Sequence, residues 1–129
     1  MEQFAVRTSS RTQFLDITSD VQRAVAATGV SEGICLVYVP HTTAGVTINE
    51  NADPDVVRDM LKELNKVIPF EDGYAHAEGN SAAHVKTSLV GSSCTIPIEG
   101  GRLALGTWQA VYFCEFDGPR SRKVWVTCR

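Results

Sequence analysis

The sequence predicts an α+β fold in a single domain, with a largely antiparallel sheet covered by helices. The chain has 129 residues, and a domain takes roughly 150 residues, so one domain is expected over residues 1–129. Hydrophobic residues make up 43% and charged residues 21%, so the chain can bury a core. The apolar periodicity alternates between that of strands and that of helices. It indicates two strands, one helix, two strands, two helices and four strands.

The first elements are two strands and a helix. Phe4, Val6 and Thr8 alternate with polar or small residues, two serines can turn the chain, and residues 12–16 can return, which indicates an antiparallel strand pair. Ser19 and Gln22 match a capping box, and Gly29 stands where a helix-ending glycine belongs. A short helix between these signals is therefore expected.

Two strands and a longer helix follow. Residues 33–40 and 46–49 are rich in β-branched side chains and predict strands. Asp53 is expected to cap the next helix, with Pro54 as its first residue. Its apolar residues repeat at helical spacing, so they must face a sheet or a partner. They are Val57, Met60, Leu61 and Leu64.

The second half contains a loop, a helix and the last four strands. Residues 69–79 predict an irregular loop, and Asn80 or Ser81 can cap a helix that ends at Gly91. Turn sequences at residues 100–101 and 117–119 separate the strands that follow. With connections this short, these strands are expected to pair antiparallel with one another. The strands are residues 94–98, 102–105, 107–116 and 123–128.

Charge and cysteine usage exclude several classes of protein. The net charge of −3 offers no general attraction to nucleic acid or anionic lipid, so neither is an expected partner. The start of the chain lacks the features of a secretory signal, and its longest apolar run, residues 34–40, is too short to span a bilayer. A cytoplasmic protein is therefore expected. The four cysteines form no C-x-x-C pair and are expected to be buried reduced thiols rather than nucleophiles.

The three histidines are the best functional clue. His41, His76 and His84 all lie among polar and small residues that do not look like core. Neutral imidazole is a common zinc ligand, and three imidazoles with an open fourth position form a catalytic zinc geometry. The spacing matches no zinc-finger or H-E-x-x-H motif, and a single histidine is more often a structural or surface residue, so a structural role is favoured for each histidine taken alone.

A second polar group precedes the long helix. Glu50, Asn51, Asp53 and Asp55 form a dense patch, of which the two aspartates are also what a helix amino terminus favours. Glu50 and Asn51 are not explained by capping. Either is a candidate partner that orients an imidazole, a general base or a metal ligand.

Residues 115–122 place acids and two arginines around a tight turn. Arg120 and Arg122 there can grip a phosphate or carboxylate, and a solvated hairpin tip is the alternative. Lys86 lies two positions after His84 on the expected helix and points about 200° away from it, so it need not serve the same site. Trp108 is interpreted as core or interface bulk.

Several stretches, in order along the chain, resemble the YjbQ-like family of small proteins, some of which are described as secondary thiamine-phosphate synthases. The resemblance covers nearly the whole chain. The stretches are residues 40–44 (PHTTA), 48–55 (INENADPD), 74–80 (YAHAEGN), 83–86 (AHVK), 105–109 (LGTWQ) and 115–120 (EFDGPR).

The resemblance implies an α+β fold, a homotrimer and a metal or active site formed by the histidine-bearing segments. His41, His76 and His84 match the family's histidines. The family's polar positions match Glu50, Asn51, Asp53 and Arg120.

Three functions remain open at this point. The first, implied by the resemblance, is an enzyme of small phosphorylated metabolites that forms thiamine phosphate by displacing pyrophosphate. Cations must then neutralise the departing charge, most often Mg²⁺ with carboxylates and arginines such as Glu50, Asp53 and Arg120. Three imidazoles suit Zn²⁺ better than Mg²⁺. A zinc-dependent hydrolase with Glu50 as base is therefore the second, and a non-enzymatic trimer that binds a metal or ligand is the third.

Overall fold

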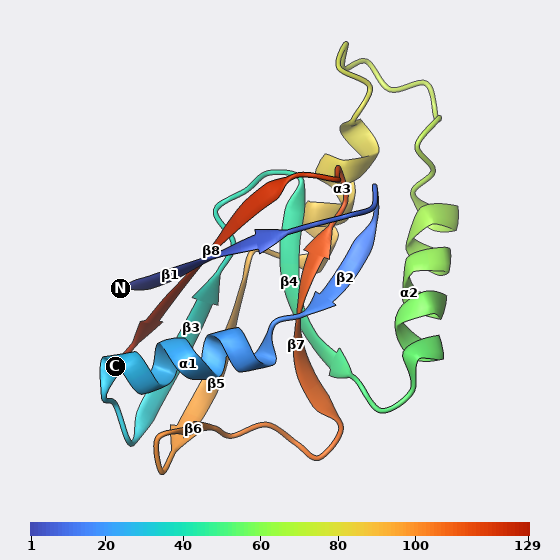
Figure 1. Ribbon diagram of the computed structural model, residues 1–129. Helices are drawn as coiled ribbons and strands as arrows, with labels where there is room; N and C mark the ends of the chain where they lie inside the picture. Colours follow the sequence, from blue (N-terminus) through green and yellow to red (C-terminus); the bar gives the residue numbers. More distant parts are fainter.

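The computed structural model describes residues 1–129 and contains two antiparallel sheets and three helices. The elements follow one another as two strands, one helix, two strands, two helices and four strands (Figure 1). The α+β class and the antiparallel pairing are as the sequence predicts, but there are two sheets rather than one. The strands are β1 (Glu2–Arg7), β2 (Gln13–Asp16), β3 (Gly33–Tyr38), β4 (Ala44–Glu50), β5 (Ser93–Glu99), β6 (Arg102–Leu103), β7 (Gln109–Glu115) and β8 (Ser121–Cys128).

Strand pairing differs from the expectation in two places. The sheets have the orders β1-β8-β3-β5-β6 and β2-β7-β4. The first two strands therefore do not pair with each other, because β1 pairs with β8 and β2 with β7. The last four strands are also divided: β5 pairs with β6, whereas β7 and β8 lie in different sheets. Both edges of β8 are already occupied by β1 and β3, and both edges of β7 by β2 and β4.

The helices are α1 (Thr18–Thr28), α2 (Pro54–Val67) and α3 (Ser81–Val90). The predicted caps at Asp53 and Gly29 are confirmed: the Asp53 carboxylate accepts a hydrogen bond from the Asp55 N–H, and Gly29 has φ of 73°. The predicted capping box is wrong, because Gln22 instead bonds Gly101 and Leu103 across the molecule. Nor does a side chain cap α3, since the Asn80 amide donates to another segment.

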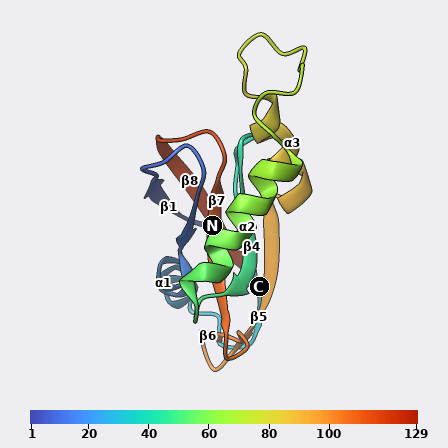
Figure 2. The ribbon, with the colours of Figure 1, turned by 90° about the vertical axis from the view of Figure 1, so that its right-hand side faces the viewer.

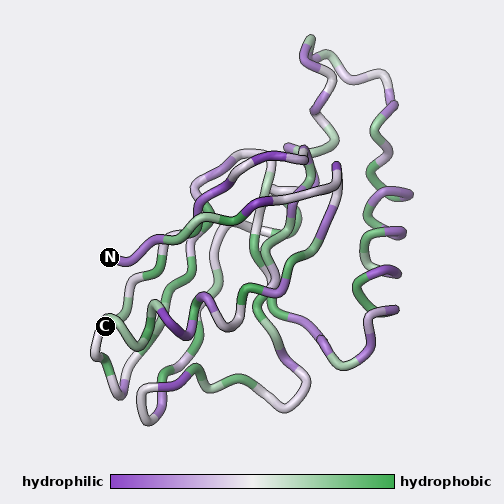
Figure 3. The backbone as a smooth tube through the Cα atoms, in the orientation of Figure 1, coloured by the Kyte–Doolittle hydropathy of each residue, from purple (hydrophilic) through white to green (hydrophobic).

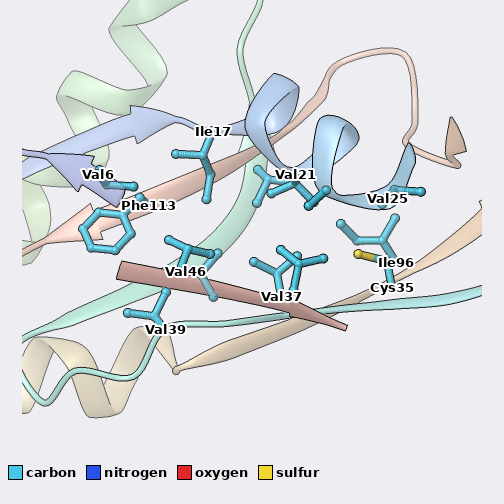
Figure 4. Close-up of a cluster of buried hydrophobic side chains, with 14 of the residues drawn as sticks. Val6, Ile17, Val21, Val25, Cys35, Val37, Val39, Val46, Ile96 and Phe113 are labelled. Atoms are coloured by element: carbon cyan, nitrogen blue, oxygen red, sulfur yellow. The ribbon is translucent and has the colours of Figure 1, made fainter. Parts of the chain in front are cut away.

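The core has two parts, one on each face of the three-stranded sheet. The larger cluster lies between α1 and the strands of both sheets and includes Val21, Val37 and Phe113 (Figure 4). The smaller cluster surrounds Phe14 and Phe116 and packs against the predicted apolar stripe of α2. Figure 2 shows α2 lying across this outer side, and Figure 3 shows its hydrophobic side turned toward the strands. None of the three helices is both long and apolar enough to cross a membrane.

Candidate functional site

A cleft of about 790 Å³ is lined by all three histidines. They come from three separate parts of the chain: His41 from the loop after β3, His76 from the segment between α2 and α3, and His84 from α3. Arg120 and Arg122, from the turn before β8 and from β8 itself, complete the cationic part of the lining. The fold thus brings the three sequence-predicted histidines and Arg120 to one open, polar cavity.

His41 is held by the backbone of β8. The Lys123 N–H donates a hydrogen bond of 2.9 Å to Nε2 of the imidazole. Burial lowers the pKa of His41 from its usual 6.5, and the nearby Arg122 guanidinium lowers it further. The ring is therefore neutral at pH 7, with the lone pair of Nε2 used as an acceptor.

His76 and His84 form a close pair on the other side of the cleft. Their ring centroids lie 5.7 Å apart in an edge-to-face arrangement. The segment that carries His76 projects beyond the sheets in Figure 1, and Nε2 of His76 lies 4.0 Å from Glu78 Oε2. His84 is fixed by the packing of α3 on β4, where the Val46 N–H donates to the Gly91 carbonyl.

That packing depends on a glycine in β4. A Cβ at Gly45 would lie 2.4 Å from the Gly91 carbonyl oxygen. Real Cβ atoms do not approach a backbone oxygen this closely, so only glycine lets the end of α3 approach β4 so closely. The position of His84 therefore rests on the absence of a side chain at Gly45.

Arg120 belongs to a small network at the rim of the cleft. Its Nε and Nη2 donate to the carbonyl and carboxylate of Asp117, at 2.9 and 3.2 Å. The same carboxylate oxygen accepts a hydrogen bond of 3.0 Å from the Asn80 amide. This network joins the turn between β7 and β8 to the start of α3, and it leaves Nη1 of Arg120 without a bond to the protein.

Arg122 is buried behind this rim, with only 4% of its surface exposed. It pairs with the fully buried Glu115, and its Nη2 also bonds the carbonyl and hydroxyl oxygens of Thr43. The remaining donors to Glu115 are the Thr8 hydroxyl and the N–H groups of Phe116 and Asp117. Every oxygen of this buried carboxylate is thus satisfied, and Arg122 is fixed in place.

The second predicted polar group lies elsewhere. Glu50, Asn51 and Asp53 follow the far end of β4, and a seven-residue strand separates them from the His41 loop by roughly 20 Å. None of the three lines the cleft. Asp53 caps α2, and the Asn51 amide contacts Asp16 at 3.4 Å. The single chain does not bring this group together with the histidines.

No three His, Cys, Asp or Glu side chains converge with a geometry that could hold a metal ion. The bond that His41 accepts gives a physical reason. A neutral imidazole binds a metal through an unprotonated nitrogen, and in His41 that nitrogen already accepts the Lys123 N–H. A three-histidine zinc site within this chain therefore does not fit the residues as they are placed.

Sequence reasoning missed an aromatic pair in the cleft lining. Tyr38 and Trp125, on neighbouring strands, stack with ring centroids 5.8 Å apart and an interplanar angle of 26°. The available signal was the alternation of β3 and β8, which turns Tyr38 and Trp125 to the face opposite the core residues Val37 and Val126. Their common position became evident only with the pairing of the two strands.

Two other singled-out residues lie outside the cleft. Lys86 is fully buried, its Nζ lies 3.7 Å from the centroid of the Phe70 ring, and burial lowers its pKa to about 8. Trp108 is 63% exposed, so it is not a core residue, and a role at an interface stays a prediction. All four cysteines are free thiols, and burial raises the pKa of Cys94 to about 11.

Sequence comparison connects the chain to known relatives. The family model described as UPF0047 protein YjbQ-like matches residues 2–129. The UPF0047 protein YugU of Bacillus subtilis is 52% identical over 122 residues, which cover 94% of this chain and 92% of that protein. A UPF0047 protein of Methanocaldococcus jannaschii is 50% identical over 123 residues, which cover 95% and 89%.

Solved structures agree with this relationship. A crystal structure of a YjbQ/UPF0047 family protein from Clostridium acetobutylicum matches 100% of both chains with a TM-score of 0.98 and 57% identity. A hypothetical protein from Aeropyrum pernix matches with a TM-score of 0.94 and 38% identity over 99% of this chain and 96% of that one. The chain belongs to the YjbQ-like UPF0047 family.

Proposed function

We propose that this protein is an enzyme of small phosphorylated metabolites, with formation of thiamine phosphate as the specific reaction. The main support for the proposal is that three imidazoles, Arg120 and Arg122 line the same cleft. A polar cavity of this size, lined by guanidinium donors, suits a small anionic molecule. The named reaction comes from the resemblance of the histidine-bearing motifs to those of the YjbQ-like family.

The reaction requires the cleft to stabilise negative charge on a leaving group. The nitrogen of a thiazole phosphate attacks the methylene carbon of a pyrimidine diphosphate; the carbon–nitrogen bond forms, and the carbon–oxygen bond breaks. Pyrophosphate leaves with the bonding electrons, so negative charge grows on its oxygen. Guanidinium groups stabilise such charge by charge-assisted hydrogen bonds. Arg120 supplies this group at the rim, where its Nη1 has no bond to the protein.

Mg²⁺ prefers oxygen ligands, and the cleft lining contains two carboxylates. Glu78 and Asp117 both belong to the lining. Mg²⁺ is typically held by one or two carboxylates together with substrate phosphates. If Mg²⁺ enters with the pyrophosphate, these carboxylates are the lining residues that would hold it, and the ion would add positive charge beside the leaving group.

Steady-state kinetics with the pyrimidine diphosphate and the thiazole phosphate test the proposal. Arg120→Ala should lower kcat/KM by about tenfold or more, because it removes a charged hydrogen-bond donor. Arg58→Ala, which removes an arginine of α2 outside the cleft, is the matched control and should leave kcat/KM unchanged. A trace rate that Arg120→Ala does not alter would refute the proposed function. Phosphate-ester binding without turnover would instead favour the non-enzymatic ligand-binding protein.

The zinc-dependent hydrolase is the second candidate, and the proximity of His76 and His84 favours it. Two imidazoles at this separation can share a metal, with further ligands from water or substrate. The hypothesis predicts about one zinc ion per chain by elemental analysis, and loss of the ion in His84→Ala. Purified protein that binds no zinc in the presence of excess ion would contradict it.

We also propose that the active form is a homotrimer, as the family resemblance implies. Large apolar side chains at α2 and α3 are exposed to solvent in the single chain, which supports an assembly of several chains. Val67 and Leu89, each 65% exposed, border an apolar groove of about 350 Å³. Exposed apolar surface of this kind is typical of contacts between subunits.

A further inference from the structure

The buried arginine of the cleft has one free nitrogen. Arg122 uses Nε and Nη2 for all of its bonds to Glu115 and Thr43. Nη1 takes part in none of them, and it is not among the polar atoms sealed from solvent without a partner. Because Arg122 lines the cleft while 96% of its surface is covered, Nη1 is the part of the guanidinium that can meet a ligand there.

His41 offers a second donor in the lining of the same cleft. Its Nε2 accepts the Lys123 N–H, so that nitrogen carries no proton. A neutral imidazole has one proton, which in His41 must therefore lie on Nδ1. Arg122 is near enough to lower the pKa of His41 by its charge, and both side chains line the same cleft.

We propose that Nη1 of Arg122 and Nδ1–H of His41 form a binding site for the oxygens of a phosphoryl group, in which His41 acts as a neutral hydrogen-bond donor and not as a metal ligand. The inference rests on the proposed function for the nature of the ligand, a phosphate ester. It assigns to Arg122 and His41 the contact with that ester.

The network behind the site explains why these donors would be effective. Five hydrogen-bond donors surround Glu115, so the carboxylate cannot turn, and it holds two nitrogens of the guanidinium. Ligand binding therefore costs little conformational entropy at Arg122, because the folded protein already holds this side chain in one orientation. The role of Glu115 is to position Arg122, and it does not contact the ligand itself.

The ligand is expected to be a phosphoryl group rather than a carboxylate. The Arg122 charge is already balanced by Glu115, and that of Arg120 by Asp117, so the site offers directed donors more than net charge. A tetrahedral phosphoryl group has enough oxygens to meet Arg122, His41 and the open Nη1 of Arg120 at once, whereas a carboxylate has two. Selectivity for phosphate over acetate is thus a consequence of the geometry.

Nitrogen NMR of ¹⁵N-histidine and ¹⁵N-arginine labelled protein tests the inference directly. In the free protein at pH 7, the His41 proton should be on Nδ1, with Nε2 unprotonated. Inorganic phosphate should shift the signals of His41 Nδ1 and of the Arg122 guanidinium, whereas acetate at equal ionic strength should not. One equivalent of Zn²⁺ should leave the His41 signals unmoved. A proton on Nε2, or zinc-induced shifts at His41, would overturn the inference.

Two variants provide a binding test that does not depend on removing the buried ion pair. His41→Ala should weaken phosphate binding by at least about tenfold, since it removes a donor to a charged group. His41→Asn keeps an N–H donor near the position of Nδ1 and should recover most of the affinity. Equal affinities for phosphate in wild type and His41→Ala would contradict the assignment.

The outcomes separate this inference from the proposed function. If thiamine phosphate forms and depends on Arg120, but phosphate does not affect His41 or Arg122, the inference fails and the proposed function stands. If phosphate shifts both residues but no thiamine phosphate forms, the phosphoryl site stands and the named reaction is wrong.

Discussion

At the scale of single residues, Glu115 connects stability and function. Burial alone would raise the pKa of this carboxyl group. The hydrogen bonds from Arg122, the Asp117 N–H and Thr8, together with the Arg122 charge, more than offset that effect and hold the pKa below its usual 4.5. Glu115 is therefore ionised in the folded protein at pH 7, and it keeps the buried Arg122 paired.

Glu115→Gln should lower the free energy of unfolding by about 3–5 kcal/mol at pH 7, because it leaves the Arg122 charge buried without its counter-ion. Urea denaturation measures this change. Asp55→Asn is the control: it removes the exposed ion pair with Arg58 and should have little effect. A loss of stability in Glu115→Gln no larger than in this control would contradict the account of the network.

The same pair predicts a pH dependence with a definite sign. A carboxyl group whose folded pKa is depressed stabilises the protein above its unfolded pKa and loses that contribution as pH falls through the folded pKa. The stability of the wild type should therefore fall as pH drops below about 4.5. Glu115→Gln lacks this contribution. The difference in unfolding free energy between the variant and wild type, measured by urea denaturation, should therefore become smaller as pH falls below about 4.5. A deficit that stays constant down to pH 3 would contradict the depressed pKa.

The candidate site was predictable only in part at this scale. Residue type and polar surroundings singled out His41, His76 and His84, and the fold places all three in one cleft. Glu50 and Asn51 also have surroundings unlike those of core residues. They lie at the end of β4 that is distant from the cleft, and local sequence does not reveal that separation. The availability of Arg122 Nη1 and the proton position on His41 follow from contacts between distant residues, and a single sequence does not encode these directly.

At the scale of elements, helix ends were predicted better than strand partners. Caps are local, so Asp53 with Pro54 and Gly29 could be identified from neighbouring residues alone. Strand partners are not local: β1 and β2 are joined by a short serine-containing turn, as in a hairpin, but each pairs with a distant strand in a different sheet. The turn between β7 and β8 likewise carries the chain from one sheet to the other and brings Arg120 to the cleft.

Asp53 allows a structural role to be separated from a catalytic one. Asp53→Ala should cost about 1 kcal/mol of stability, because the Asp55 N–H loses its acceptor. Since Asp53 does not line the cleft, phosphate affinity and kcat/KM should stay at the wild-type values. Thermal denaturation and steady-state kinetics provide the two readouts. A tenfold fall in kcat/KM with unchanged stability would instead give Asp53 the catalytic role that its position in the sequence also allowed.

At the scale of the whole molecule, the proposed homotrimer can be tested by measuring the molecular mass in solution. Multi-angle light scattering at micromolar concentration should give three times the 14.0 kDa mass of one chain. Dilution that yields a monomer with full activity would contradict the need for a trimer. A stable monomer at all concentrations would leave the apolar groove between α2 and α3 without the proposed contact.

Crystallography can locate the proposed binding of a metabolite's phosphoryl group in the cleft. Tungstate mimics phosphate and scatters anomalously, so a crystal soaked in tungstate locates the group without ambiguity. An anomalous peak is expected in the cleft, within hydrogen-bond distance of Arg122 Nη1 and His41 Nδ1. A peak only at other surfaces, or one bound by His76 and His84 while Arg122 and His41 stay unoccupied, would contradict it.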